Sequence, residues 1–124
     1  MAAPRRRPEQ VGELVRQVIA EALLREVRDP RIRLVTVTRV TVTGDLSLAR
    51  VFVSVSGDET DREAALAGLE SASGFLRARV ARALHNRTTP ELVFEPDRGA
   101  EHAHRIDQIL GELRRAEEGR GGAP

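Results

Sequence analysis

The apolar residues of this chain change their spacing twice, and this change constrains the fold more than any other feature. Residues 11–27 carry apolar side chains every three or four positions, which is the spacing of an amphipathic helix. Residues 34–56 are rich in β-branched residues and alternate apolar with polar side chains, as β-strands do. Helical spacing then returns over residues 60–86. The pattern predicts a helix, a pair of strands and a second helical region.

The two strands are predicted to form a hairpin, over residues 34–43 and 48–56, around the turn Gly44-Asp45-Leu46-Ser47. In the second strand the valines keep one phase, but in the first strand Val35 and Val37 are odd whereas Val40 and Val42 are even. Since a one-residue slip would send half of them to the wrong face, we expect a bulge or strong twist near Thr38-Arg39. The first helix should begin after Pro8, and Asp29-Pro30 should stop it.

The second helical region contains an expected interruption. Thr60 and Glu63 fit a capping box at its start. The tripeptide Ala72-Ser73-Gly74 lies in the middle of the apolar stripe, and a glycine inside a helix costs about 0.5–1 kcal/mol relative to alanine. We therefore predict a kink there that separates two helices.

A short strand over residues 90–96 and a last helix around residues 103–113 complete the order helix-strand-strand-helix-kink-helix-strand-helix. A three-stranded sheet cannot bury both faces alone, so the helices are expected on one face of a two-layer α+β domain. The predicted boundaries are a flexible basic N-terminus over residues 1–8, one domain over residues 9–115 and a flexible tail over residues 116–124.

Composition excludes several classes of protein. The 124 residues suit one domain and include no cysteine, so neither a disulfide framework nor a zinc-thiolate site is expected. The basic start is not followed by an apolar run, and no stretch approaches the ~20 apolar residues of a membrane span. We expect a cytoplasmic protein without a membrane partner, and a monomer.

A search for catalytic residues finds no coherent site. His102 and His104 are two positions apart, so on a helix they point to different sides and do not share a metal. Ser71 and Ser73 are the candidate nucleophiles for His85, but neither lies in a nucleophile elbow. No phosphate-binding glycine loop follows a strand. No enzymatic activity, metal or cofactor is expected.

Arginine provides the positive evidence for function, because all 20 basic residues are arginines. After the expected kink, residues 75–90 carry Arg77, Arg79, Arg82 and Arg87 without any acidic residue. A glycine kink alone is also typical of close packing, and a row of arginines alone is typical of a solvated face. Together, the kink and the arginines favour a surface that binds a phosphate backbone. Because we place Phe75 and Phe94 in the core, base stacking should be weak, and recognition should depend on shape.

Four segments of the chain form a recognisable set of motifs: RDPRI (28–32), VTVTRVTVTGDLSLARVFVSV (35–55), SASGFLRARVARALHNRTTPELVFEPD (71–97) and RID (105–107). In these segments the chain resembles the ribosome-binding factor A family, assembly factors of the bacterial small subunit. It implies a type II KH-like fold in which the Ala-x-Gly kink at residues 72–74 replaces the glycine loop of other KH modules. It also implies binding to the immature small subunit near the 5′-terminal helix of 16S rRNA, a role in late maturation and in the cold, and an assembly GTPase as a partner.

The predicted RNA interface contains residues around the kink, on the arginine-rich helix and after the first helix: Ser73, Gly74, Arg77, Arg79, Arg82, His85, Arg87, Arg28, Arg31 and Arg33. Two alternatives are a general single-stranded RNA-binding KH module and a protein-interaction adaptor that uses the C-terminal helix. Arginine contacts to phosphate carry no sequence information, so selectivity should come from the folded rRNA and from neighbouring ribosomal proteins.

Overall fold

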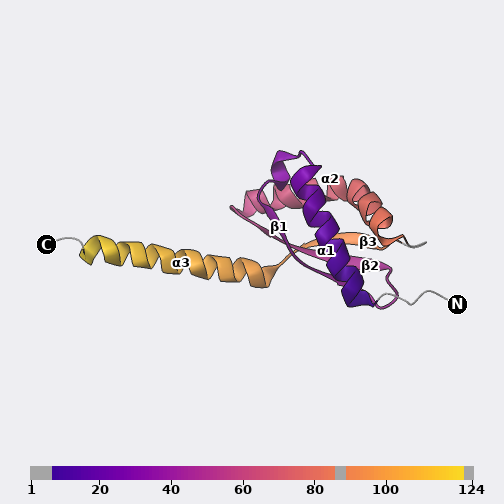
Figure 1. Cartoon of the computed structure of the whole chain (residues 1–124). Helices are drawn as coiled ribbons and strands as arrows, with labels where there is room; N and C mark the ends of the chain where they lie inside the picture. Colours follow the sequence, from indigo (N-terminus) through magenta and orange to yellow (C-terminus); the bar gives the residue numbers. More distant parts are fainter. Residues whose placement is uncertain (1–6, 86–88, 122–124) are drawn as a thin grey trace.

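A computed structural model of the chain describes residues 7–85 and 89–121. Its elements are α1 (Pro8–Arg25), the short 3-10 helix η1 (Pro30–Ile32), β1 (Val35–Val42), β2 (Leu48–Val55), α2 (Glu59–Leu84), β3 (Glu91–Pro96) and α3 (Arg98–Gly121). The three strands form one sheet in the order β1-β2-β3, and α1 and α2 cover one of its faces (Figure 1). The predicted two-layer α+β fold of KH-like type is confirmed.

The first helix starts with Pro8 itself, at a position where the missing N–H of proline costs nothing. It ends at Arg25, before Asp29-Pro30, which the sequence predicted as the stop. Pro30 instead opens η1, where the carboxylate of Asp29 accepts the backbone N–H of Arg31 at 2.9 Å. The chain therefore makes a separate short turn between α1 and the sheet.

The hairpin is confirmed together with its bulge. β1 and β2 pair antiparallel, and the register shifts between Val37 and Arg39, which leaves Thr38 without a partner in the ladder. The hydroxyl of Thr38 donates to a carboxylate oxygen of Asp97 at 2.6 Å, and its oxygen lies 3.1 Å from the carbonyl oxygen of Phe52. The bulge thus places one polar side chain where it can contact the start of α3.

The capping box of α2 lies two residues earlier than predicted. The carboxylate of Asp58 accepts the N–H of Asp61, and the carboxylate of Asp61 accepts the N–H of Asp58, both at 2.9 Å. Thr60 and Glu63 have the same spacing, so the sequence alone offers two candidate caps. Gly57, with a φ of 127°, turns the chain directly before Asp58 and so selects the first of them.

The predicted division of the second helical region into two helices is wrong, because α2 is one continuous helix of 26 residues. Among the described glycines only Gly57 has a positive φ, so Gly74 keeps helical backbone angles. One glycine costs only about 1 kcal/mol, and Leu69 and Leu76, both fully buried, anchor α2 on either side of it. Figure 1 shows that α2 nevertheless bends, with its second half turning toward β3.

The core lies between α1, α2 and the covered face of the sheet. The predicted apolar stripe of α2 is confirmed there, although Ala72 is only partly buried. The buried residues of the core are Val11, Val15, Ile19, Ala22, Ile32, Val37, Val51, Val53, Val55, Ala65, Leu69, Leu76, Val80 and Leu84.

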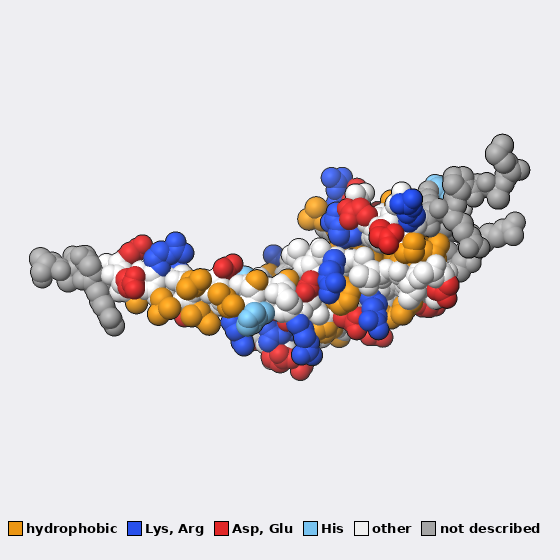
Figure 2. All heavy atoms as spheres, turned by 90° about the horizontal axis from the view of Figure 1, so that it is seen from below, with side chains coloured by type: hydrophobic (Ala, Val, Ile, Leu, Met, Phe, Trp, Pro, Cys, Tyr) orange, Lys and Arg blue, Asp and Glu red, His pale blue; other side chains and the backbone are white. Residues whose placement is uncertain are grey.

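The sheet is completed by β3, which pairs in parallel with β2. The last helix, α3, follows directly and extends away from the domain (Figure 1). It reaches Gly121 and so includes residues 116–121, where the sequence predicted a flexible tail. Its apolar side chains are exposed, from 43% to 57%, and lie along its length (Figure 2): Ile106, Ile109, Leu110 and Leu113. None of the helices in the described part of the chain is long and apolar enough to span a membrane.

Candidate nucleic-acid interface

The arginines on the second half of α2 have different surroundings, although they lie within six residues. Arg77 points to the segment before β3, where its guanidinium donates to the carbonyl oxygens of Thr89 at 3.0 Å and Pro90 at 3.4 Å. It also lies 3.7 Å from the carboxylate of Glu91. These contacts hold the start of β3 against α2, so Arg77 has a structural role.

Arg79 connects α2 to the end of α1. Its Nε donates to the carboxylate of Glu26 at 2.6 Å, and its guanidinium carbon lies 4.8 Å from the centre of the Phe75 ring. Its side chain is 31% exposed. A phosphate would have to compete with Glu26 for this guanidinium, so Arg79 is a weaker candidate ligand than the sequence predicted.

Arg31 is also engaged within the protein. It forms a two-pronged ion pair with Asp29, with a shortest distance of 2.6 Å. Hydrogen bonds from the side chain and the backbone of Arg31 hold the pKa of Asp29 below its ordinary value. The same turn packs closely on α2, because a Cβ at Gly68 would lie 3.1 Å from Ile32 and 3.3 Å from Arg31. Arg31 therefore shapes the loop on which its neighbours lie.

Four arginines of the predicted interface remain, and the three that lie in the described residues are exposed and have no ion-pair partner there: Arg28, Arg33 and Arg82. Arg28 lies between α1 and η1, Arg33 caps η1, and Arg82 lies in the last turn of α2. A guanidinium without a carboxylate partner keeps its full charge available for a phosphate oxygen. These three are the candidate phosphate ligands.

The remaining predicted residues lie on or after α2. Ser73 is half-buried and Gly74 is exposed, with no atom within 4 Å of the place where a Cβ would lie. His85 caps the C-terminus of α2 in a left-handed conformation, with a φ of 53°, and is exposed. Arg87 lies outside the described residues.

Phe75 is the site residue that the sequence reasoning missed. We predicted it in the core, but its side chain is 41% exposed. The signal was present in the spacing, because the buried stripe of α2 passes through Leu76 and Val80, and Phe75 lies one position away from it. Phe94, by contrast, packs against the core as predicted.

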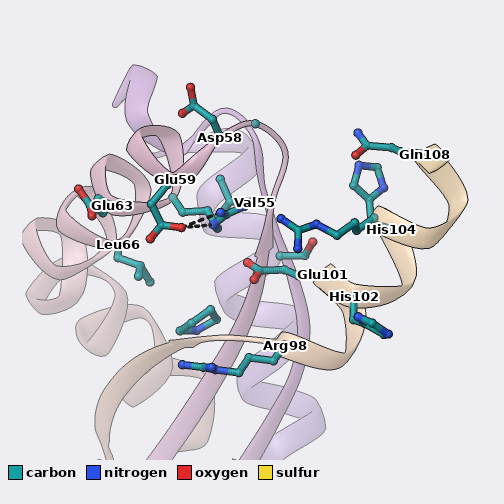
Figure 3. Close-up of a pocket in the computed structure, with 15 residues that line it drawn as sticks. Val55, Asp58, Glu59, Glu63, Leu66, Arg98, Glu101, His102, His104 and Gln108 are labelled. Carbon is teal, nitrogen blue, oxygen red and sulfur yellow. Dashed lines mark hydrogen bonds and ion pairs between the residues drawn. The ribbon is translucent and has the colours of Figure 1, made fainter. Parts of the chain in front are cut away.

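The two histidines of α3 border a hollow of about 640 Å³ between the start of α2, the end of β2 and the start of α3 (Figure 3). Their rings point to different sides of α3, as predicted for residues two positions apart. Arg62 and Glu59, both in the first turns of α2, form an ion pair at 2.6 Å on one side of this hollow. In residues 7–85 and 89–121 there is no group of three or more His, Asp or Glu side chains that could hold a metal ion.

Together these features define a small α+β protein of KH-like fold with exposed, unpaired arginines beside its two packed helices. The chain belongs to the ribosome-binding factor A family, whose sequence model matches residues 7–110. It is 45% identical over 114 residues to ribosome-binding factor A of Rhodopirellula baltica, covering 92% of this chain and 83% of the relative. It is 42% identical to ribosome-binding factor A of Halothermothrix orenii, covering 92% of this chain and 93% of the relative.

Solved structures agree with this assignment. The crystal structure of ribosome-binding factor A from Thermus thermophilus superimposes with a TM-score of 0.63 at 31% identity, over 72% of this chain and 94% of that chain. A homology model of the Thermus thermophilus protein, fitted into a cryo-EM map of a 30S–RbfA complex, superimposes with a TM-score of 0.61 at 32% identity, over 73% of this chain and 96% of that chain.

Proposed function

We propose that this protein is a non-catalytic assembly factor that binds the immature small ribosomal subunit. The observation that carries the proposal is its likeness, at 32% identity, to a relative whose homology model was fitted into the map of a 30S complex. Membership of the family over residues 7–110 supports it. The family resemblance further favours binding near the 5′-terminal helix of 16S rRNA and a role in late rRNA maturation and in the cold. We also propose that the protein acts as a monomer, and the composition favours the cytoplasm.

The surface offered to rRNA in this proposal consists of Arg28, Arg33 and Arg82, together with the end of α2. Arg31, Arg77 and Arg79 contribute by holding the loop, β3 and α1 in place. Since contacts to phosphate fix position without reading bases, the shape of the folded rRNA and the neighbouring ribosomal proteins supply the selectivity.

Release from the finished subunit requires a change in the subunit or a second agent. A bound protein shifts an rRNA equilibrium only by its differential affinity for the two conformations. A subunit that reaches the conformation with lower affinity therefore loses the factor. An assembly GTPase is the class of partner that would drive this change.

Sedimentation with purified small subunits in a salt series tests the proposal. The parent should co-sediment with subunits, and its affinity should fall as salt rises, because bound phosphates release counterions. Arg82→Gln should weaken binding. It should also reduce the slope of log affinity against log salt concentration (the salt slope) by about the amount that one phosphate contact contributes. Arg114→Gln, an exposed position on α3, serves as the matched control and should leave the slope unchanged.

Failure of the parent to co-sediment would contradict ribosome binding. Equal affinity for any single-stranded RNA would instead favour a general KH module. Binding that is insensitive to salt would favour a protein adaptor.

A further inference from the structure

Phe75 is the only phenylalanine that is exposed in the described part of the chain, and it lies on α2 among residues of the predicted interface. The chain contains only three phenylalanines and neither tyrosine nor tryptophan. Phe52 and Phe94 are partly buried on the sheet, whereas Phe75 is 41% exposed on α2. Single exposed apolar residues are common on protein surfaces, but an exposed aromatic ring also offers a π-face on which a base can stack.

Phe75 lies on an exposed face of α2. Ser71, Phe75, Ala78 and Arg82 follow one another at spacings of four, three and four residues, so they share one face of α2, and all four are exposed. Gly74, beside them, has no atom within 4 Å of its missing Cβ. The small side chains on this face leave space for a planar group to lie against the ring.

Arg79 fixes the orientation of the ring. Its guanidinium carbon lies 4.8 Å from the ring centre, and its Nε is bound to Glu26 at 2.6 Å. Because Glu26 holds Arg79, the guanidinium that covers one part of the ring is itself held in place. Phe75 is thus presented in a defined orientation, which reduces the entropy lost when a ligand binds.

The charge of this face favours a nucleotide over an apolar peptide. No acidic residue occurs between residues 71 and 85, and Glu26, which reaches this part of α2 from the end of α1, is paired with Arg79. Arg82, two turns beyond Phe75, has no ion-pair partner within the described residues. An unpaired nucleotide carries a flat base next to a phosphate, which matches an aromatic ring next to an unpaired guanidinium.

We propose that Phe75 is a stacking platform for one unpaired base of the RNA ligand, with Arg82 binding an adjacent phosphate. This proposal rests on the proposed function, since it names a contact within the same RNA interface. Phe75 would add a contact that is independent of charge, because stacking uses the π-face of the base, whereas Arg82 supplies the salt-dependent part.

Three variants measured with small subunits test the platform. Phe75→Leu keeps an apolar side chain but removes the π-face, whereas Phe75→Trp replaces the π-face with a larger one. We expect about a tenfold loss of subunit affinity for Phe75→Leu, since stacking on one base contributes at the scale of a tenfold change in affinity. Phe75→Trp should bind at least as tightly as the parent. Leu113→Ala, on the apolar side of α3, is the control for loss of an exposed apolar group.

The salt slope separates stacking from charge. Phe75→Leu should keep the slope of the parent, while Arg82→Gln should reduce it. Thermal unfolding of each preparation confirms that the variants are folded. The platform is wrong if Phe75→Leu binds as the parent does, or if the leucine and tryptophan variants are weakened alike.

The ranking of the variants also distinguishes an RNA base from a protein neighbour. An apolar protein groove would accept leucine and reject the larger tryptophan, which is the opposite order and would overturn the proposal. If the parent itself does not bind subunits, the proposed function fails. If the parent binds and Phe75→Leu is unaffected, only the platform fails.

Discussion

At the scale of the single residue, identical side chains in this protein have roles that depend on their partners. Arg77 and Arg82 lie five positions apart on α2, yet Arg77 bonds to two backbone carbonyls and lies beside Glu91, whereas Arg82 is exposed without an ion pair in the described part of the chain. Removing the charge of Arg77 should therefore affect stability, whereas removing the charge of Arg82 should affect binding.

We expect Arg77→Gln to lower the free energy of unfolding by about 1 kcal/mol, since it loses hydrogen bonds from a charged donor that is partly exposed. Arg82→Gln should stay within about 0.5 kcal/mol of the parent, as surface substitutions usually do. Urea unfolding of the two variants measures both values. Equal stability of Arg77→Gln and the parent would show that Arg77 does not hold β3.

Two glycines provide a second test at this scale. Gly74 has helical backbone angles and open space around its missing Cβ, so Gly74→Ala should raise the free energy of unfolding by up to about 1 kcal/mol. In the matched variant Gly12→Ala, the new Cβ would lie 2.8 Å from the carbonyl oxygen of Val40, so the protein should be destabilised. Thermal midpoints of both proteins check the two signs.

The same Gly74→Ala protein tests the bend in α2. Alanine favours a straight helix, so we expect weaker binding to small subunits despite the higher stability. Parental affinity in the stabilised variant would remove the bend from the binding mechanism.

At the scale of the element, the direction of α3 depends on one carboxylate. Asp97 accepts the hydroxyl of Thr38 at 2.6 Å and the N–H of Ala100 at 3.2 Å, and it lies 3.6 Å from the guanidinium of Arg39. The bulge in β1 places Thr38 and Arg39 where they can reach Asp97. The bulge in β1 therefore supplies contacts to Asp97 at the start of α3, a helix whose own apolar side chains are outside the core.

The stabilisation that the Asp97 carboxylate provides should depend on pH. The hydrogen bond from Thr38, then that from Ala100, hold the pKa of Asp97 below its ordinary value. A lowered pKa in the folded state means that the stabilisation is present at neutral pH, above the unfolded pKa of about 3.9, and is lost as pH falls through the folded pKa.

We expect Asp97→Ala to be less stable than the parent by about 1 kcal/mol at pH 7, the usual cost of losing a helix cap. The difference should shrink as pH falls from the unfolded pKa of about 3.9 through the lower folded pKa of Asp97. Unfolding curves at a series of pH values measure it, with Asp107→Ala in the middle of α3 as the control at neutral pH. A difference that does not depend on pH would show that the charge of Asp97 is not involved.

At the scale of the whole molecule, the domain and α3 are largely separate. All residues of the described core come from α1, η1, the hairpin and α2, and the apolar side chains of α3 are exposed. A chain that ends after Arg105 removes these side chains but keeps the cap at Asp97. We expect its thermal midpoint to lie within about 4 °C of the parent, a shift that corresponds to 1 kcal/mol or less. Loss of cooperative unfolding would show instead that α3 stabilises the domain.

Much of this architecture could be predicted from the sequence because its signals are local. The spacing of apolar residues indicates helix and strand directly, and the change of phase between Val37 and Val40 revealed the bulge. Where two local signals competed, prediction was less certain. Asp58 and Thr60 both fit a helix cap, and one glycine at position 74 was taken as a break although the burial of Leu69 and Leu76 outweighs its cost.

By itself, the sequence determined the order of the elements, the α+β class and the family. Only the tertiary structure decided which candidate site residues remain available to a ligand. The carboxylate that binds Arg79 comes from Glu26, 53 positions away, and the acceptors of Arg77 precede β3. Phe75 is exposed because the packing of α2 on the sheet buries the neighbouring stripe instead. Periodicity depends on residues a few positions apart, whereas pairing and exposure depend on which distant segments meet when the chain folds.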